Sequence, residues 1–117
     1  MQTWSDSQPI YRQLADRLAA QLLDGHPPEG EALPSVRALA SRYLINPLTV
    51  SRALQSLADE GLVEPRRGLG MYVQAGAAER LRRSERERFL RQEWPRLAER
   101  LHRLGITPDD LDWEVRE

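Results

Sequence analysis

The segment INPLTVSRALQSLADEGLV, residues 45–63, places a proline just inside the start of a strongly patterned helix. Pro47 is tolerated in a first helical turn, because the N–H that it lacks has no partner within the helix there. Asn46 is then a natural cap and Gly61 a natural end. The apolar residues recur at steps of three and four, which predicts one buried side: Val50, Ala53, Leu54 and Leu57.

Another helix is predicted near the start of the chain. It begins near Pro9, a residue suited to a first turn, and stops at Gly25. The segment GHPPEGEALP that follows has the composition of a loop. The buried stripe of this helix repeats at spacing four: Ile10, Leu14, Leu18 and Leu22.

A short helix follows the loop, with Ser35 as its expected N-cap. Because the residue before a proline avoids the helical region, we expect a tight turn around Ile45 and Asn46. The apolar side of this short helix is again spaced as in a helix: Val36, Leu39, Ala40 and Tyr43.

Two short strands are predicted after the third helix, at Leu62–Pro65 and Met71–Gln74. Between them RRGLG supplies the glycines that a hairpin turn requires. The order of helix, helix, tight turn, helix and hairpin is that of a winged helix-turn-helix. The expected fold is therefore mainly α with a small β-hairpin, and residues 1–76 form the winged domain.

Residues 77–117 are expected to form a tail of two helices. The chain turns helical and highly charged from Ala77 to Gly105, and Thr107 caps a last short helix. Pro95 should kink or break the long helix near Trp94. The apolar residues leave a surface that a second copy of the chain would cover; the alternative is two separate helices that fold back on their own chain. The predicted dimerisation residues are Leu90, Trp94, Leu97, Leu101 and Leu104.

Composition limits the class of protein. The 117 residues suffice for one compact domain with a short appendage, and the absence of cysteine excludes disulfides and thiolate metal sites. No apolar run approaches the roughly 18 residues that a membrane span needs, and nothing resembles a signal peptide, so we expect a soluble cytoplasmic protein. The net charge of −1 gives no argument for nucleic acid, although all 17 basic residues are arginines, which suit bidentate contacts with phosphates and guanine.

The sequence gives little support to catalysis. His26 and His102 are far apart and have no clustered partners at the spacing of metal ligands. The glycines of RRGLG lie inside a predicted hairpin and not in a phosphate-binding loop after a strand. We therefore expect no enzyme activity, no metal and no cofactor.

Three motifs together resemble the DNA-binding domain of the GntR family of bacterial transcriptional regulators: LPSVRALA, NPLTVSRAL and DEGLVEPRRGLGMYV. The resemblance runs from about Pro9 to Val73. Most GntR-like proteins carry a large C-terminal effector domain, and the short tail is instead similar to the YtrA-like branch, whose tail helices serve mainly in dimerisation. The resemblance implies a homodimer at the bacterial nucleoid that binds a palindromic operator in double-stranded DNA, usually as a repressor.

The third helix has a side that faces away from its buried stripe and could read base edges in the major groove. Its start also offers N–H groups and a positive dipole end to a phosphate. At Ser51 many GntR relatives have an arginine that contacts DNA, and one helical step rotates a side chain by about 100°, so whether Arg52 replaces that contact is left open. The candidate residues are Asn46, Leu48, Thr49, Ser51, Arg52 and Gln55.

The resemblance implies DNA contacts elsewhere too. It places Arg37, near the start of the second helix, on DNA, and it places Gly68 and Gly70 where the wing backbone approaches the minor groove. Arg66 and Arg67 could hold phosphates or enter that groove.

Each assignment has a plainer alternative. Arg37 could be an ordinary surface residue, Arg52 could pair with Asp59 or Glu60, and any tight hairpin needs glycines. Two other functions are also open. A winged helix can bind another protein through an apolar outer face, and an unknown small-molecule effector could bind between winged domain and tail, although a short tail leaves little volume for a pocket.

Overall fold

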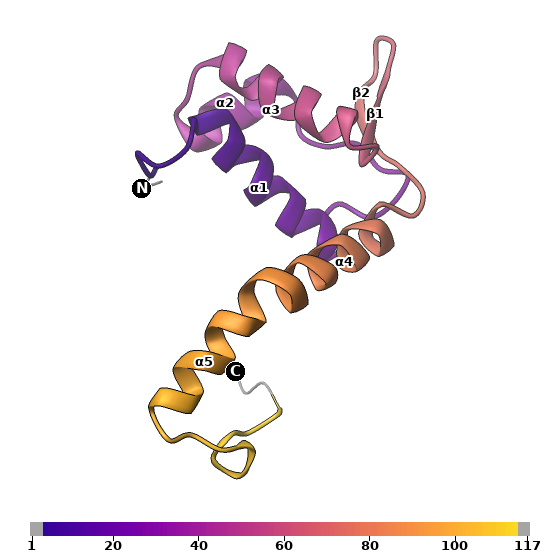
Figure 1. Ribbon diagram of the computed structural model, residues 1–117. Coiled ribbons are helices and arrows are strands. Elements are labelled where there is room, and N and C mark those ends of the chain that lie inside the picture. The colour runs from indigo at the N-terminus through magenta and orange to yellow at the C-terminus, as the bar shows by residue number, and fades with distance from the viewer. Residues whose placement is uncertain (1–3, 115–117) are drawn as a thin grey trace. The chain divides into compact units, whose positions relative to one another are not determined.

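The computed structural model describes residues 4–114 (Figure 1). The outer ends of the two predicted domains, residues 1–3 and 115–117, lie outside the described residues. The chain forms two compact units, of which the first reaches to Arg82 and the second starts at Arg83. The boundary between them lies inside helix α4 (Ala77–Arg88).

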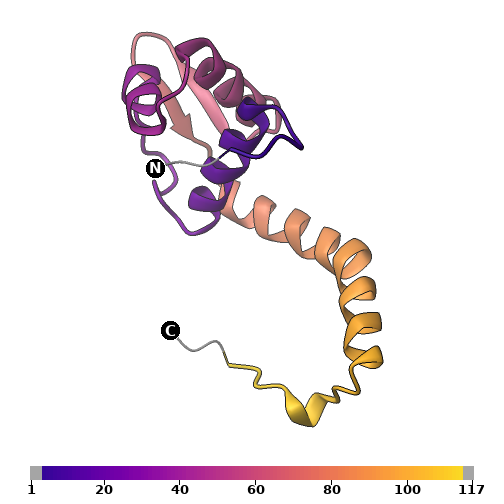
Figure 2. The same cartoon turned by 90° about the vertical axis from the view of Figure 1, so that its left-hand side faces the viewer.

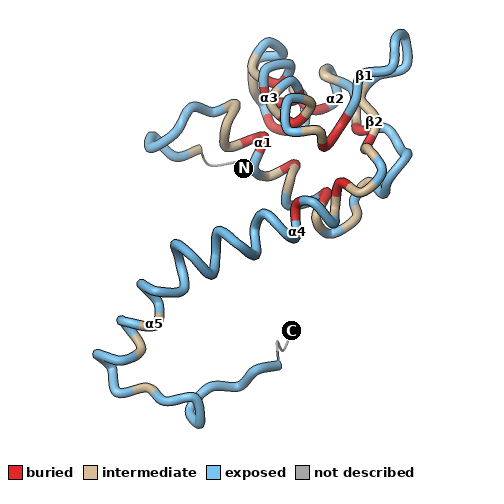
Figure 3. Tube along the Cα trace, turned by 45° about the vertical axis from the view of Figure 1, so that its right-hand side comes forward, coloured by how far each residue is buried: buried red, intermediate tan, exposed pale blue. Residues whose placement is uncertain are grey.

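Three helices build the core of the first unit: α1 (Ile10–Leu23), α2 (Val36–Tyr43) and α3 (Pro47–Asp59). Figure 3 shows the buried stretches of these helices and of the hairpin gathered inside this unit. Most of the predicted stripe is confirmed as buried: Leu14, Leu18, Leu22, Leu39, Tyr43, Val50, Ala53, Leu54 and Leu57. The prediction is wrong for Ile10, which is 40% exposed because the first turn of α1 lies at the rim of its contact with α3.

The turn between α2 and α3 reverses the chain at Leu44. This residue adopts a left-handed conformation, with φ at 56°, and the N–H of Ile45 donates to the carbonyl of Ala40 at 3.1 Å. A left-handed residue after a helix is normally glycine or asparagine, because a Cβ is strained there. The sequence predicted the turn at Ile45 and Asn46 but gave no sign that a leucine would carry the reversal.

The wing is an antiparallel hairpin of β1 (Val63–Arg66) and β2 (Gly70–Val73). Each strand differs by one residue from the predicted bounds. β1 starts late because Leu62 still closes the end of α3, where its N–H donates to the carbonyl of Leu57 at 3.0 Å. The winged helix-turn-helix order predicted from the sequence is thus confirmed.

Residues 30–33, expected as part of a loop, pair with β2. The N–H of Leu33 donates to the carbonyl of Met71 at 2.8 Å, and the N–H of Val73 donates to the carbonyl of Glu31 at 2.9 Å. This pairing fixes the base of the wing to the segment that leads into α2.

The first turns of α4 belong to the core of the first unit. Ala77 and Leu81 are buried there. The guanidinium of Arg80 donates to the carbonyls of Gly61 and Ala75 and so satisfies backbone groups at the end of α3 and before α4.

The second unit continues from α4 through a π-helix, η1 (Phe89–Glu93), into α5 (Trp94–Arg103) and a short 3-10 turn, η2 (Pro108–Asp110). Pro95 does not interrupt the helical run. The N–H of Trp94 instead donates to the carbonyl of Phe89, five residues back, and the wider turn avoids the clash that a proline ring makes with a regular α turn. The helical path bends in this stretch (Figure 2).

Candidate nucleic-acid interface

The start of α3 is closed by its own side chain and backbone. Asn46 Oδ1 accepts a hydrogen bond from the N–H of Leu48 at 2.8 Å, which confirms the predicted cap. Pro47 has no N–H, and the N–H of Thr49 donates to the carbonyl of Asn46 at 2.9 Å. The expectation of free N–H groups at this helix start is therefore wrong, and what the start offers an anion is the positive end of the helix dipole.

The side of α3 that faces away from the core is polar over its first turns. Ser51, Arg52 and Gln55 are exposed, and Thr49 is half-buried. Leu48 is the one predicted contact residue of α3 that is apolar, and it is 78% exposed. The helix thus presents hydroxyl, amide and guanidinium groups beside one leucine, a set that can donate to and accept from base edges.

The start of α2 carries Arg37. Ser35 Oγ accepts a hydrogen bond from the N–H of Ala38 at 3.1 Å, so this predicted cap is confirmed as well. Arg37 follows in the first turn and is exposed. It makes no hydrogen bond or ion pair with any residue in the described part of the chain, so its guanidinium is free to take an external anion.

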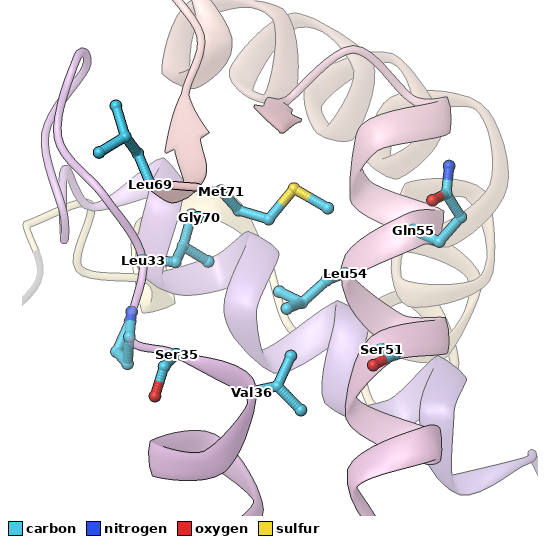
Figure 4. Close-up of a pocket in the computed structure, with 10 residues that line it drawn as sticks. Leu33, Ser35, Val36, Ser51, Leu54, Gln55, Leu69, Gly70 and Met71 are labelled. Carbon is cyan, nitrogen blue, oxygen red and sulfur yellow. The ribbon is translucent and has the colours of Figure 1, made fainter. Parts of the chain in front are cut away.

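A pocket of about 360 Å³ lies between the start of α2, the middle of α3 and the residues that follow the tip of the wing (Figure 4). Figure 4 shows Ser51 and Gln55 on α3, across from Ser35 and from the wing residues Leu69 and Met71. The side of α3 that holds Ser51 therefore faces α2 and the wing. The short serine side chain leaves this space unfilled.

Arg52 lies on a different side of α3, against the start of α1. Its guanidinium carbon is 4.0 Å from the centre of the Tyr11 ring, a cation–π stack. The alternative pairing of Arg52 with Asp59 or Glu60 is wrong: Gln55 donates to Asp59 at 3.0 Å, and the carboxylate of Glu60 faces another arginine, Arg12, at 3.9 Å. Tyr11 is a residue that the sequence reasoning missed.

The two wing arginines differ. Arg66 stacks on the ring of Tyr72, with 4.1 Å to the ring centre, and its guanidinium lies 3.4 Å from the carboxylate of Glu64. Arg67 is exposed at the tip and makes no ion pair or hydrogen bond with a residue between 4 and 114. Of the two, only Arg67 lacks an ion-pair or ring partner among residues 4–114.

The wing glycines are explained by backbone conformation. Gly68 has φ at 76° and Gly70 has φ at 104°, values that favour glycine over any residue with a Cβ. A Cβ added at either position would meet no atom within 4 Å, so no neighbour among residues 4–114 requires the absence of a side chain. Any close approach at these glycines would be to a group outside the chain.

The predicted dimerisation residues all belong to the second unit and lie at its surface. No side chain among residues 83–114 is buried. Phe89, Glu93, Arg96, Leu97 and Arg100 line a shallow pocket of about 330 Å³ on it. Of the predicted dimerisation residues, only Leu101 is half-buried, and the exposed ones are Leu90, Trp94, Leu97 and Leu104.

The described residues contain neither a cluster of metal-ligating side chains nor a membrane-spanning helix. Residues 4–114 contain no group of three or more His, Cys, Asp or Glu side chains that could hold a metal ion. Within the same range, no helix is both long and apolar enough to cross a membrane.

Sequence comparison identifies relatives along most of the chain. The family model described as bacterial regulatory proteins, gntR family, matches residues 10–73. The chain is 32% identical over 111 residues to the HTH-type transcriptional repressor YtrA of Bacillus subtilis, across 95% of this chain and 85% of that protein. It is 31% identical over 114 residues to the HTH-type transcriptional regulator YhcF of the same organism, across 92% of this chain and 88% of that protein.

Solved structures agree. A GntR family transcriptional regulator from Listeria monocytogenes superposes with a TM-score of 0.73 at 27% identity, over 91% of each chain. YtrA from Sulfolobus acidocaldarius, a GntR-family transcription factor, superposes with a TM-score of 0.57 at 32% identity, over 74% of this chain and 90% of that one. These proteins are named as regulators, which confirms that the chain is not an enzyme. The chain belongs to the GntR family of bacterial regulatory proteins, with YtrA among its relatives.

Proposed function

We propose that this protein is a cytoplasmic transcriptional repressor that binds a palindromic operator as a homodimer. In this proposal α3 enters the major groove and the wing lies near the minor groove. The relative YtrA of Bacillus subtilis is named a transcriptional repressor, which supports repression over activation for this chain.

The observation that carries the proposal is the two-sided character of α3. On one side Val50, Ala53 and Leu57 are completely or almost completely buried, and this packing holds the helix against the core. The other side presents Ser51 and Gln55, which are exposed and polar. A recognition helix needs both properties, because base reading depends on side chains held in a fixed register along the groove.

Three arginines on three different elements of the winged domain supply charge for the DNA backbone. Arg37, Arg52 and Arg67 lie on α2, α3 and the wing, and none pairs with a carboxylate in residues 4–114. Unpaired guanidinium groups on three elements can neutralise phosphates, even though the whole chain has a formal charge of −1.

The exposed apolar side chains of the tail support the proposal of a homodimer. A helix with exposed Leu90, Trp94 and Leu97 and no buried side chain in its own unit leaves apolar surface in water. A twofold partner that offers the same surface would cover it, and the two winged units would then reach two half-sites of a palindrome. No side chain among residues 83–114 is buried, so the second unit does not cover this apolar surface by itself.

A winged helix used for protein contact is disfavoured by the chemistry of α3. That function needs an apolar outer face between Thr49 and Gln55, and the exposed residues there are a serine, an arginine and a glutamine. The exposed leucines, Leu44 and Leu48, lie before this stretch.

The test is selection of bound duplexes from a randomised DNA library, followed by titration of the selected duplex and of a scrambled duplex of equal composition. We expect a palindromic consensus, and an affinity for the selected duplex that exceeds that for the scrambled one by about a thousandfold or more. Equal affinity for both duplexes would contradict sequence-specific regulation.

A further inference from the structure

Tyr11 and Arg52 form a contact between α1 and α3 that the proposed function does not by itself explain. The Arg52 guanidinium carbon lies 4.0 Å from the ring centre of Tyr11. Arg12 is farther from the same ring, at 5.5 Å, and its guanidinium lies 3.9 Å from the carboxylate of Glu60. Arg52 is therefore the cation that the ring holds most closely.

The ring is itself held in place. Tyr11 is half-buried and packs against the core. The side-chain amide of Gln13, two residues further along α1, donates to the carbonyls of Ser5 and Gln8 at 2.7 and 2.8 Å and accepts from the N–H of Ser5 at 2.8 Å. These bonds brace the segment that enters α1, beside the half-buried ring of Tyr11.

The contact of Arg52 with the Tyr11 ring is a cation–π contact and not a hydrogen bond. Arg52 is exposed and makes no hydrogen bond or ion pair with any residue in the range 4–114. A guanidinium donates in its plane, in a fork that matches two oxygens of a phosphate or carboxylate. The N–H donors of Arg52 are therefore available to an anion from outside the chain.

The place of the stack distinguishes Arg52 from Ser51. Ser51 lines the pocket with α2 and the wing. Arg52 lines a separate groove with Pro9, Ile10 and Leu48, at the start of α1. Arg52 is thus held on the flank of α3 and does not extend from the side that faces the wing.

We propose that Tyr11 is a positioning residue that holds Arg52 for one phosphate of the DNA backbone at the flank of the recognition helix. Arg52 then adds affinity but no sequence preference, and it does not take over the contact that an arginine at position 51 makes in many GntR relatives. This inference rests on the proposed function, because it needs DNA in the groove beside α3.

The experiment is a double-mutant cycle with Tyr11→Leu, Arg52→Ala and the double variant, and with Tyr11→Phe as the conservative control. Affinity is measured against salt concentration, on a duplex selected by the wild-type protein and on a scrambled duplex. Thermal unfolding by circular dichroism checks that each variant folds. Leucine keeps apolar volume without a π face, whereas phenylalanine keeps the π face without the hydroxyl.

We expect Arg52→Ala to weaken binding to both duplexes by the same factor. It should also make the slope of log affinity against log salt less steep by about 0.9, the value for one lost phosphate contact. Tyr11→Leu should lower the affinity for both duplexes by about two- to fivefold, which is the effect of losing a surface cation–π contact. Tyr11→Phe should bind as the wild type does. In the Arg52→Ala background, Tyr11→Leu should have no further effect.

Three results would overturn the inference. Arg52→Ala could weaken the selected duplex alone with an unchanged salt slope, which would make Arg52 a base-reading residue. Tyr11→Leu could act equally with and without Arg52, or it could have no effect. If Tyr11→Leu does not fold, NMR decides: upfield ring-current shifts of the Arg52 side-chain protons in the wild type and in Tyr11→Phe support the stack, and their absence refutes it. A wild-type protein that binds neither duplex would instead refute the proposed function.

Discussion

The two units of this chain differ in how many of their side chains they bury. The first unit buries a stripe from each of its three helices together with Val63 and Val73 from the two strands of the wing. The second unit has a helical path as long as any in the first, yet residues 83–114 bury nothing. Local helix formation alone rarely stabilises a segment of this length in water, because packing supplies most of the stability of helices in proteins. In the proposed dimer, the second copy of the chain would supply that packing for the tail.

The largest expected effect comes from matched leucine truncations in the two units. Leu39→Ala removes a side chain that is 0% exposed, and it should lower the unfolding free energy by about 2–5 kcal/mol. Leu97→Ala, at a side chain that is 42% exposed, should cost less than about 1 kcal/mol in the monomeric chain. Urea unfolding followed by circular dichroism at low protein concentration measures both. Equal losses would mean that the tail has a core of its own.

The second prediction concerns what covers the tail. Leu90→Glu combined with Leu97→Glu places charges on the proposed contact, where an unpaired buried charge costs several kcal/mol. We expect sedimentation equilibrium to give the mass of a dimer for the wild type and of a monomer for the variant. Leu69→Glu is the matched control, since Leu69 is an exposed leucine of the wing, and its mass should remain that of a dimer. A dimer that persists in the tail variant would exclude the tail as the interface.

A third, smaller effect is expected on DNA affinity. Arg37→Ala removes an exposed guanidinium without a partner in the described chain, and it should weaken operator binding about tenfold, or ~1.4 kcal/mol. Arg42→Ala, an exposed arginine in the last turn of the same helix, should change affinity far less. Fluorescence anisotropy with a labelled duplex compares them. If both variants bind as the wild type does while their circular dichroism stays native, the implied role of Arg37 is wrong.

The smallest effect tests strain in the first unit. Leu44 holds a left-handed conformation with a side chain that is 79% exposed, so it gains little packing in return. Leu44→Asn should raise the unfolding free energy by roughly 0.5–1 kcal/mol, because asparagine tolerates this conformation better. Leu48→Asn, at a leucine of similar exposure in a regular helix, should not stabilise the protein. Thermal unfolding of the two variants is the measurement, and equal midpoints would remove the strain argument.

Features that depend on neighbouring residues alone could be predicted from the sequence. The stripe of α3, its cap at Asn46 and the glycines of the wing depend on local rules, and each lies where the rules place it. The same rules misplace Ile10, because spacing identifies a side of a helix but not where its contact with the next helix ends.

Features that join distant segments could not be predicted. The stack of Arg52 on Tyr11 joins residues far apart in sequence, and no local pattern indicated it. The left-handed Leu44 has no local signal, because leucine is an unusual residue there. The π turn before Pro95 is one of several ways to accommodate a proline, and the sequence specified only that some distortion would occur.

The central claim is that two copies of the chain read one palindromic operator. Sedimentation velocity of the protein with a duplex selected from a randomised library measures the number of chains bound to each duplex. The account predicts two chains per duplex, with half-sites about one helical turn apart, roughly 10 base pairs. It also predicts that raising the salt concentration dissociates the complex. One chain bound to a duplex without twofold symmetry would contradict it.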